Sequence, residues 1–188
     1  MGEKYKNIHQ ELIDECRNGN TKAQFELYKL YYKAMYNTSL RLVNDGMEAE
    51  DIMQEAFLRA FKNINTYKEE VSFGAWLKKI VVNRSLDFLK KRKLETGELD
   101  EGRTVVVDEN NDEDLDDQLQ KVAEIKQAIA QLSDKYRVIV TLHLIEGYDH
   151  EEISQILDIP IKTSRTHLRR GKLKLQDLLK PNYNAKRY

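Results

Sequence analysis

The sequence predicts an all-α protein with two small helical domains joined by an acidic flexible linker. Three observations support this fold class. The 188 residues include only 2 prolines and 8 glycines, so few positions would interrupt a helix. Apolar residues recur at helical spacing on both sides of residues 95–117, a segment with 11 acidic residues and 1 basic residue. Such a block of like charge repels itself, so we expect it to separate residues 1–94 from residues 118–188.

Four amphipathic helices are predicted in the first domain, at about residues 12–16, 25–43, 48–64 and 72–93. A glycine follows the first helix, and Asn44-Asp45-Gly46 ends the second as a C-cap would. The apolar positions of these helices predict a core that includes Leu27, Leu30, Tyr31, Ala34, Met35, Leu42, Ile52, Ala56, Ala60, Leu77, Ile80 and Val81.

A polar stripe is predicted on the third helix. Asp51, Gln54, Glu55 and Leu58 follow one another at i, i+3, i+4 and i+7, so they share one face. On an isolated helix, a solvated acidic face explains this pattern better than a binding site does.

Aromatic and basic residues alternate around the start of the fourth helix. Tyr67, Lys68, Phe73 and Trp76 precede a run, residues 77–93, that has seven bases and one acid. Rings that stack on bases and cations that follow the phosphates suit single-stranded nucleic acid. Phe73 and Trp76 fit a plain hydrophobic core equally well.

The second domain contains a predicted helix-turn-helix between residues 148 and 179. Asp149 and Glu152 have the spacing of a capping box, and Asp158-Ile159-Pro160 breaks the first helix. The next helix is expected to start at once, with Pro160 or Lys162 in its first turn and Thr163 near its cap. Its apolar stripe is Leu168, Leu173 or Leu175, and Leu179. Residues 160–188 contain nine bases and one acid, a charge pattern that favours contact with DNA phosphates. A solvated basic face is the alternative.

Several functional classes lack their signatures. The 4 histidines are scattered, and no metal-binding motif or glycine-rich phosphate loop is present, so we expect no enzyme, metal or cofactor. No apolar run is long enough to span a membrane, and the start of the chain lacks a signal-peptide core, which predicts a cytoplasmic protein without membrane insertion. The 1 cysteine, Cys16, is expected to be a small buried apolar residue.

Four motifs in this order resemble the extracytoplasmic-function (ECF) group of bacterial RNA polymerase sigma factors. They are AEDIMQEAFLRAF (residues 49–61), FGAWLKKIVVNRSLDFLKKRK (73–93), LSDKYRVIVTLHLIEGYDHEEIS (132–154) and the helix-turn-helix. The resemblance covers nearly the whole chain, and the combination is more specific than any single motif.

The resemblance implies a transcription initiation factor that binds core RNA polymerase, through its β′ clamp helices and β flap, and promoter DNA. It implies a sigma region 2-like domain over residues 1–94 and a region 4-like domain over residues 118–188. An anti-sigma factor is an expected partner. The implied polymerase-binding residues are Asp51, Gln54, Glu55 and Leu58. The implied minus-10 contacts are Tyr67, Lys68, Ser72, Trp76, Lys79, Asn83 and Arg84. The implied minus-35 contacts are Thr163, Arg165, Thr166, His167, Arg169 and Arg170.

Some positions depart from the pattern usual in that group. Lys162, Ser164 and Gly171 stand where glycine, valine and alanine are common, and Gly171 is expected to cost up to about 1 kcal/mol inside a helix. Two other functions remain open from the residues alone. A stand-alone helix-turn-helix regulator would leave residues 49–93 without a role, and a polymerase adaptor that does not read DNA would leave the basic helix without one.

Overall fold

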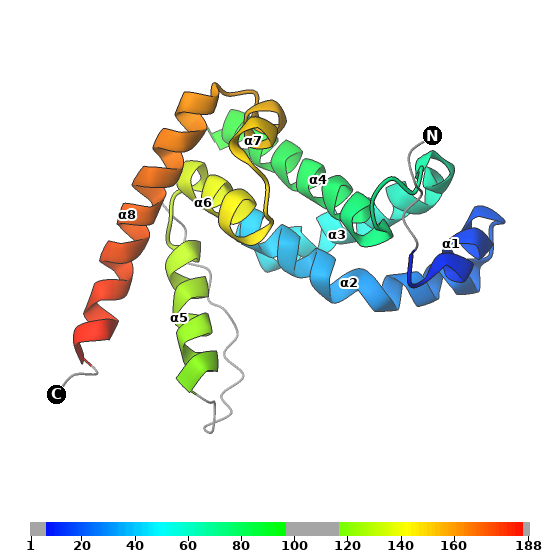
Figure 1. The fold of residues 1–188 in the computed structure, drawn as a ribbon, viewed down its shortest axis with the longest axis horizontal. Helices are drawn as coiled ribbons and strands as arrows, with labels where there is room; N and C mark the ends of the chain where they lie inside the picture. Colours follow the sequence, from blue (N-terminus) through cyan, green and yellow to red (C-terminus); the bar gives the residue numbers. More distant parts are fainter. Residues whose placement is uncertain (1–6, 97–116, 186–188) are drawn as a thin grey trace. The chain divides into compact units, whose positions relative to one another are not determined.

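The computed structural model describes residues 7–96 and 117–185, and every regular element in these ranges is helical (Figure 1). This confirms the all-α fold class. The chain divides into two compact units, Met1–Arg92 and Lys93–Tyr188. Most of the predicted linker, residues 97–116, lies outside the described part. Its first two residues end one helix, and its last residue, Asp117, begins another.

From residue 7 onward, where its description starts, the first unit is built from four α-helices and one short 3₁₀ turn. Asn20 caps the second helix, because its side chain accepts hydrogen bonds from the backbone N–H groups of Lys22 and Ala23. The elements are α1 (Gln10–Arg17), α2 (Thr21–Val43), α3 (Gly46–Lys62), η1 (Ile64–Thr66) and α4 (Phe73–Thr96), the last of which continues past Arg92.

The predicted end of the second helix at Asn44-Asp45-Gly46 is confirmed, and Asn44 is the residue that forms the C-cap of α2. Asn44, with φ of 56°, takes the left-handed conformation and donates its N–H to the carbonyl of Leu40. Asp45 then caps α3 through its side chain, and Gly46 is already the first residue of that helix. Asparagine tolerates positive φ better than most residues, so a glycine C-cap is unnecessary here.

The core of the first unit agrees with most of the predicted apolar positions. Leu27, Met35, Ala56 and Leu77 are buried in one cluster contributed by all four helices. The prediction was wrong for Leu30, which is 51% exposed, and for Ala34, which is also exposed. The buried stripe of α2 runs through Leu27, Met35 and Leu42. Leu30 and Ala34 lie to one side of this stripe.

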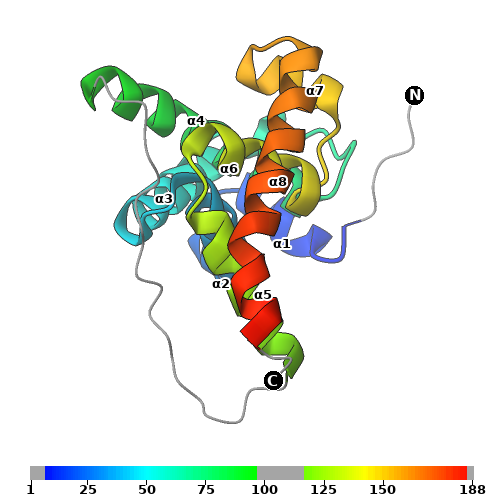
Figure 2. The ribbon, with the colours of Figure 1, turned by 90° about the vertical axis from the view of Figure 1, so that its left-hand side faces the viewer.

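Within residues 117–185, the second unit contains four α-helices and a π-helix. Figures 1 and 2 show α5 beside the C-terminal half of α8, and α6 and α7 also pack on α8. Helices α5 and α6 and the π-helical segment η2 were not predicted from the sequence. The elements are α5 (Asp117–Ala130), α6 (Asp134–Val140), η2 (Thr141–Ile145), α7 (His150–Leu157) and α8 (Ile161–Ala185).

The predicted turn between the last two helices is confirmed. The side chains of Asp149 and Glu152 form the capping box of α7, and Asp158 ends this helix with a left-handed φ of 54°. Helix α8 begins at Ile161, as expected, and the Pro160 carbonyl accepts hydrogen bonds from the backbone N–H groups of Thr163 and Ser164. Leu173 is 52% exposed, so Leu175 takes the apolar position that the sequence left open between them.

Gly171 lies where α8 packs directly against α6. A Cβ atom at this position would be 2.8 Å from Cγ2 of Val140 and 3.5 Å from Cβ of Tyr136. The glycine therefore permits a close approach of the two helices, which explains a residue that is unfavourable for helix formation by itself.

Candidate protein and nucleic-acid interfaces

The predicted polar stripe on α3 is a continuous exposed face. Asp51, Gln54, Glu55 and Leu58 all point to solvent, while Ile52, Met53, Ala56 and Phe57 bury the opposite face. Leu58 is 71% exposed. An exposed leucine among carboxylates gives this face both the charge and the apolar contact that a protein partner can use.

Met47 extends this stripe and was not identified from the sequence. It is largely exposed in the first turn of α3, and it precedes Asp51 by four residues and Gln54 by seven. These spacings place it on the same face of the helix. In the sequence, a methionine in the first turn of a helix gives no sign of a binding role. Only the exposure of its side chain in the structure shows that it belongs to the stripe.

An ion pair connects the α3 stripe to α4. Arg84, a predicted contact to DNA, pairs with Glu55, a predicted contact to polymerase. Both side chains are partly exposed, and pairs of this kind contribute at most about 1 kcal/mol. An external partner can therefore replace either member at small cost. No local pattern in the sequence indicates that the two predicted surfaces meet.

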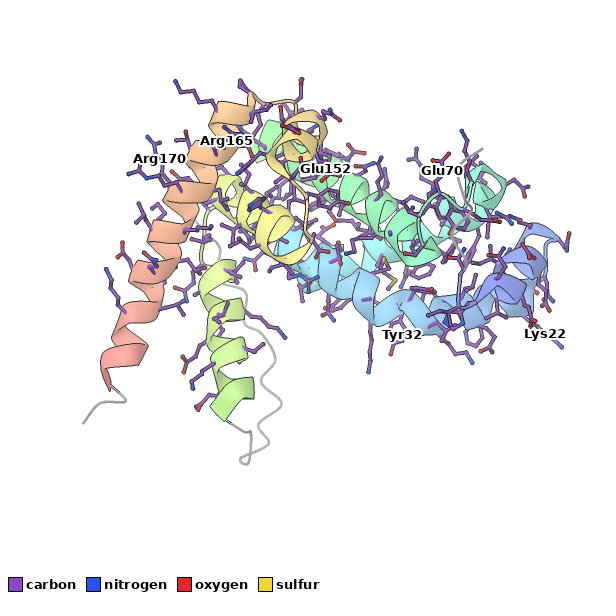
Figure 3. All side chains as sticks on the ribbon, viewed as in Figure 1. Lys22, Tyr32, Glu70, Glu152, Arg165 and Arg170 are labelled. Carbon is purple, nitrogen blue, oxygen red and sulfur yellow. The ribbon has the colours of Figure 1, made fainter. Side chains whose placement is uncertain are left out.

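The connection between η1 and α4 presents Lys68 and Glu70 to solvent but buries Tyr67. Figure 3 labels Glu70 in this connection. The Tyr67 side chain is 3% exposed, and its hydroxyl donates to the carbonyl of Val71 at 2.6 Å. Its ring packs against Phe73 and Trp76, with centroids 5.7 Å and 5.2 Å away. In this conformation Tyr67 cannot stack on a base, because its ring belongs to the core.

The remaining predicted residues of this region lie along α4. Ser72 caps the helix, since its hydroxyl accepts from the N–H of Ala75 at 3.2 Å and its carbonyl accepts from the N–H of Trp76 at 3.0 Å. Lys79 and Asn83 are exposed and follow the half-buried Trp76 by three and seven residues. The three side chains therefore share one face of α4, with the Trp76 ring at one end and the polar groups of Lys79 and Asn83 along it.

The predicted DNA-reading residues of α8 form an exposed basic face at its N-terminal half (Figure 3). Arg165, Thr166, Arg169 and Arg170 are exposed, whereas Thr163 is half-buried. His167 is also half-buried, with its ring edge-on to Tyr136 at 5.8 Å. Burial, together with the charges of Lys135 and Arg170, lowers the pKa of His167, which favours the neutral ring at neutral pH.

A hydrogen bond between a histidine and a serine connects α7 to α8, and a second histidine, in η2, stacks on the first. Nδ1 of His150 lies 2.8 Å from Oγ of the buried Ser164, and the His150 ring stacks on His143 at 4.6 Å. Burial lowers the pKa of His150, and the charges of His143, Arg165 and Lys172 lower it further against the opposing effect of Asp149. Ser164 thus makes a polar contact that the valine usual at this position would not make.

Three further observations in the described ranges concern metal ligation, membrane spans and the thiol. Within them, no group of three or more His, Cys, Asp or Glu side chains is placed to hold a metal ion. None of the helices in residues 7–96 and 117–185 is long and apolar enough to cross a membrane. Cys16 is buried, and burial and the charge of Glu15 raise its pKa to about 11, so the thiol is protonated at neutral pH.

Comparison with known sequences agrees with both units. The Sigma-70 region 2 family matches residues 27–95, and the Sigma-70, region 4 family matches residues 123–175. The chain is 32% identical to the ECF RNA polymerase sigma factor SigW of Bacillus subtilis over 177 residues, covering 89% of this chain and 95% of that protein. It is 28% identical to the RNA polymerase sigma-H factor of Pseudomonas aeruginosa, covering 92% of this chain and 94% of that protein.

Comparison with solved structures supports the fold. The sigma factor RpoE from Bartonella quintana, solved in complex with the anti-sigma factor NepR, matches with a TM-score of 0.59 and 24% identity, over 82% of this chain and 95% of that chain. CnrH, solved with the cytosolic domain of CnrY, matches with a TM-score of 0.54 and 18% identity, over 92% and 97% of the two chains.

Proposed function

The chain belongs to the ECF group of the sigma-70 family, and on that premise we propose that it directs core RNA polymerase to promoters through three separate surfaces. One surface docks on the polymerase, one holds the melted minus-10 strand, and one reads the minus-35 duplex. We assign the first two to a domain over residues 1–94 and the third to a domain over residues 118–188. The site of action is the cytoplasm, where the polymerase works.

The polymerase-docking surface is the α3 stripe of Asp51, Gln54, Glu55 and Leu58, with the β′ clamp helices as the partner. The observation that carries this assignment is that all four side chains are exposed on one face while Ile52, Met53, Ala56 and Phe57 are buried on the opposite face. Carboxylates and an exposed leucine suit a partner with basic and apolar groups. The β flap is the second polymerase contact, expected for the second domain.

The minus-10 surface consists of the connection before α4 and the exposed face of that helix. Lys68, Lys79 and Arg84 supply positive charge for phosphates, Asn83 supplies hydrogen bonds, and Trp76 supplies a ring for an unpaired base. Ser72 contributes at the start of α4. Tyr67 takes part only if the connection moves, because its ring is buried beside Trp76.

The minus-35 surface is the basic face of α8, which we propose enters the major groove as a recognition helix does. Arg165, Arg169 and Arg170 are exposed and positioned for phosphates or guanine edges. Thr163, Thr166 and His167 complete the surface, with His167 contributing as a neutral ring. An anti-sigma factor is the proposed regulator, since the matched RpoE structure contains one.

The test is run-off transcription with purified bacterial core polymerase and a library of genomic promoters. We expect defined starts with the wild-type chain and a loss of more than about tenfold in core affinity for Asp51→Arg, because a like-charge contact in an interface costs several kcal/mol. Glu11→Arg, which makes the same charge change on an exposed position of α1, is the matched control and should leave affinity unchanged.

Two results would overturn parts of this proposal. Normal transcription by Asp51→Arg would remove the docking assignment while leaving the sigma function intact. Specific binding of the isolated chain to duplex DNA, without any core-dependent start, would favour a stand-alone regulator instead.

A further inference from the structure

The connection between η1 and α4 is held in a strained backbone conformation by a buried carboxylate. Glu69 has φ of 61°, in the left-handed region that glycine, asparagine and aspartate adopt more readily. It is nevertheless 7% exposed, in a segment that otherwise faces solvent at Lys68 and Glu70. A residue of this kind persists only when its surroundings fix it in place.

Arg17, at the end of α1, makes the contacts that fix it. Its Nη1 donates to Oε1 of Glu69 at 2.6 Å, and its Nη2 donates to the backbone carbonyl of Tyr67 at 2.9 Å. Gln10 donates to the same carboxylate at 3.3 Å. One guanidinium thus holds both a side chain and the backbone of the connection, a geometry that its planar fork allows and a lysine would not reproduce.

Asn7 fixes the other end of the connection. Its Oδ1 accepts from the backbone N–H of Phe73 at 2.8 Å and lies 3.0 Å from the Tyr67 hydroxyl. Its Nδ2 donates to Gln10 at 3.1 Å. Residues 7–17 therefore contact the connection at its beginning, its strained middle and its end, from more than fifty positions away in sequence.

We propose that Asn7, Gln10 and Arg17 are positioning residues that hold the 67–72 connection in the shape that receives the unpaired promoter strand. The inference rests on the proposed minus-10 function of that connection. This clamp, formed by Asn7, Gln10 and Arg17, fixes Tyr67 and Phe73. The rings of Tyr67 and Phe73 pack against Trp76, so the clamp also sets the position of the ring that is offered to a base. A preorganised connection does not have to be ordered at the moment of binding, which increases affinity for the strand.

Trp76 provides a direct readout, because it is the 1 tryptophan of the chain and packs on both clamped rings. The first experiment measures quenching of its fluorescence by acrylamide in the full-length protein. We expect Arg17→Gln and Glu69→Gly to increase quenching, since each removes the Arg17–Glu69 pair. Glycine accepts positive φ, so Glu69→Gly removes the carboxylate without adding backbone strain and should fold.

The second experiment measures binding of the reconstituted holoenzyme to a promoter that the wild-type holoenzyme opens, as intact duplex and with the minus-10 region premelted. Arg17→Gln and Glu69→Gly should each weaken binding to the premelted template roughly tenfold, the scale of one lost hydrogen bond to a charged group. Glu15→Gln makes the same charge change as Glu69→Gly on an exposed position of α1 and should behave as wild type. Asn7→Asp keeps the acceptor and should bind better than Asn7→Leu.

The outcomes separate this inference from the function on which it rests. If the wild-type holoenzyme does not retain the premelted template, the minus-10 assignment is wrong and the inference falls with it. If the wild type retains it and both clamp variants retain it equally, only the inference is overturned. Unchanged Trp76 quenching in both variants would also overturn it, because the clamp would then not position that ring.

Discussion

At Gly171, the backbone of α8 packs directly against side chains of α6. From the sequence alone, this position is expected to destabilise the helix, since glycine lowers helix stability by up to about 1 kcal/mol relative to alanine. In the folded chain, Val140 and Tyr136 occupy the space that a Cβ atom would need. Val140 is fully buried and β-branched, so it cannot turn away without disturbing its neighbours.

We therefore predict that Gly171→Ala destabilises the protein, because overpacking costs about 1–3 kcal/mol and outweighs the gain in helix propensity. In a Val140→Ala background the same change should instead stabilise, since the truncated side chain leaves room for the new methyl group. Urea unfolding of the four proteins in this double-mutant cycle measures both effects. An increase in stability from Gly171→Ala alone would show that propensity, and not packing, decides at this position.

At the scale of the element, the helices begin and end where local chemistry indicates. Asn20, Asp45 and Asp149 cap their helices through their side chains, and Asp158 ends α7 in the left-handed region. Ser72 is the case in which local structure and function overlap. It caps α4, and it is also a proposed contact to the minus-10 strand.

The two roles of Ser72 make different predictions. Ser72→Ala should lower stability by about 1 kcal/mol through loss of the cap, as is typical for such changes. Ser72→Asp should keep the cap and the stability but weaken binding of the holoenzyme to premelted promoter, because its carboxylate repels phosphate. Thermal unfolding and template binding of both variants separate the roles. If Ser72→Asp binds as well as wild type, Ser72 is a structural cap and does not contact the strand.

At the scale of the whole molecule, charge is distributed very unevenly along a chain whose net charge is only −1. The segment 160–188 carries nine bases and one acid, whereas residues 95–117 carry eleven acids and one base. The field that DNA meets is set by the local excess and is screened over about 8–10 Å at physiological salt. The position of a charge should therefore matter more than the total.

A matched pair of variants tests this. Arg165→Gln/Arg169→Gln and Lys22→Gln/Lys33→Gln each remove two positive charges from exposed positions, the first on α8 and the second on α2. We predict that only the α8 variant weakens binding of the holoenzyme to minus-35 duplex and lowers the slope of log affinity against log salt, by up to about 0.9 for each phosphate that is no longer neutralised. Equal effects of the two variants would mean that net charge, and not the α8 face, determines binding.

The sequence by itself determined the features that depend on neighbouring residues. The helical class, the capping box of Asp149 and Glu152, the break before α8 and the exposed stripe of α3 all follow from periodicity and spacing, which act within a few turns of one helix. The family was likewise readable from motifs in their order along the chain. Each of these features is present in the structure because no contact with a residue far away in the sequence disturbs it.

Only the tertiary structure decided the features that depend on residues far apart in the chain. Tyr67 reads as an exposed aromatic but is buried, because Phe73, Trp76 and Asn7 surround it. Arg84 pairs with Glu55 across two helices, and Arg17 reaches Glu69 from α1. No local pattern in the sequence indicates such contacts, since their energy comes from groups that folding brings together. For the same reason, Gly171 was predicted only to lower helix stability, whereas in the structure it allows α8 to pack closely on α6.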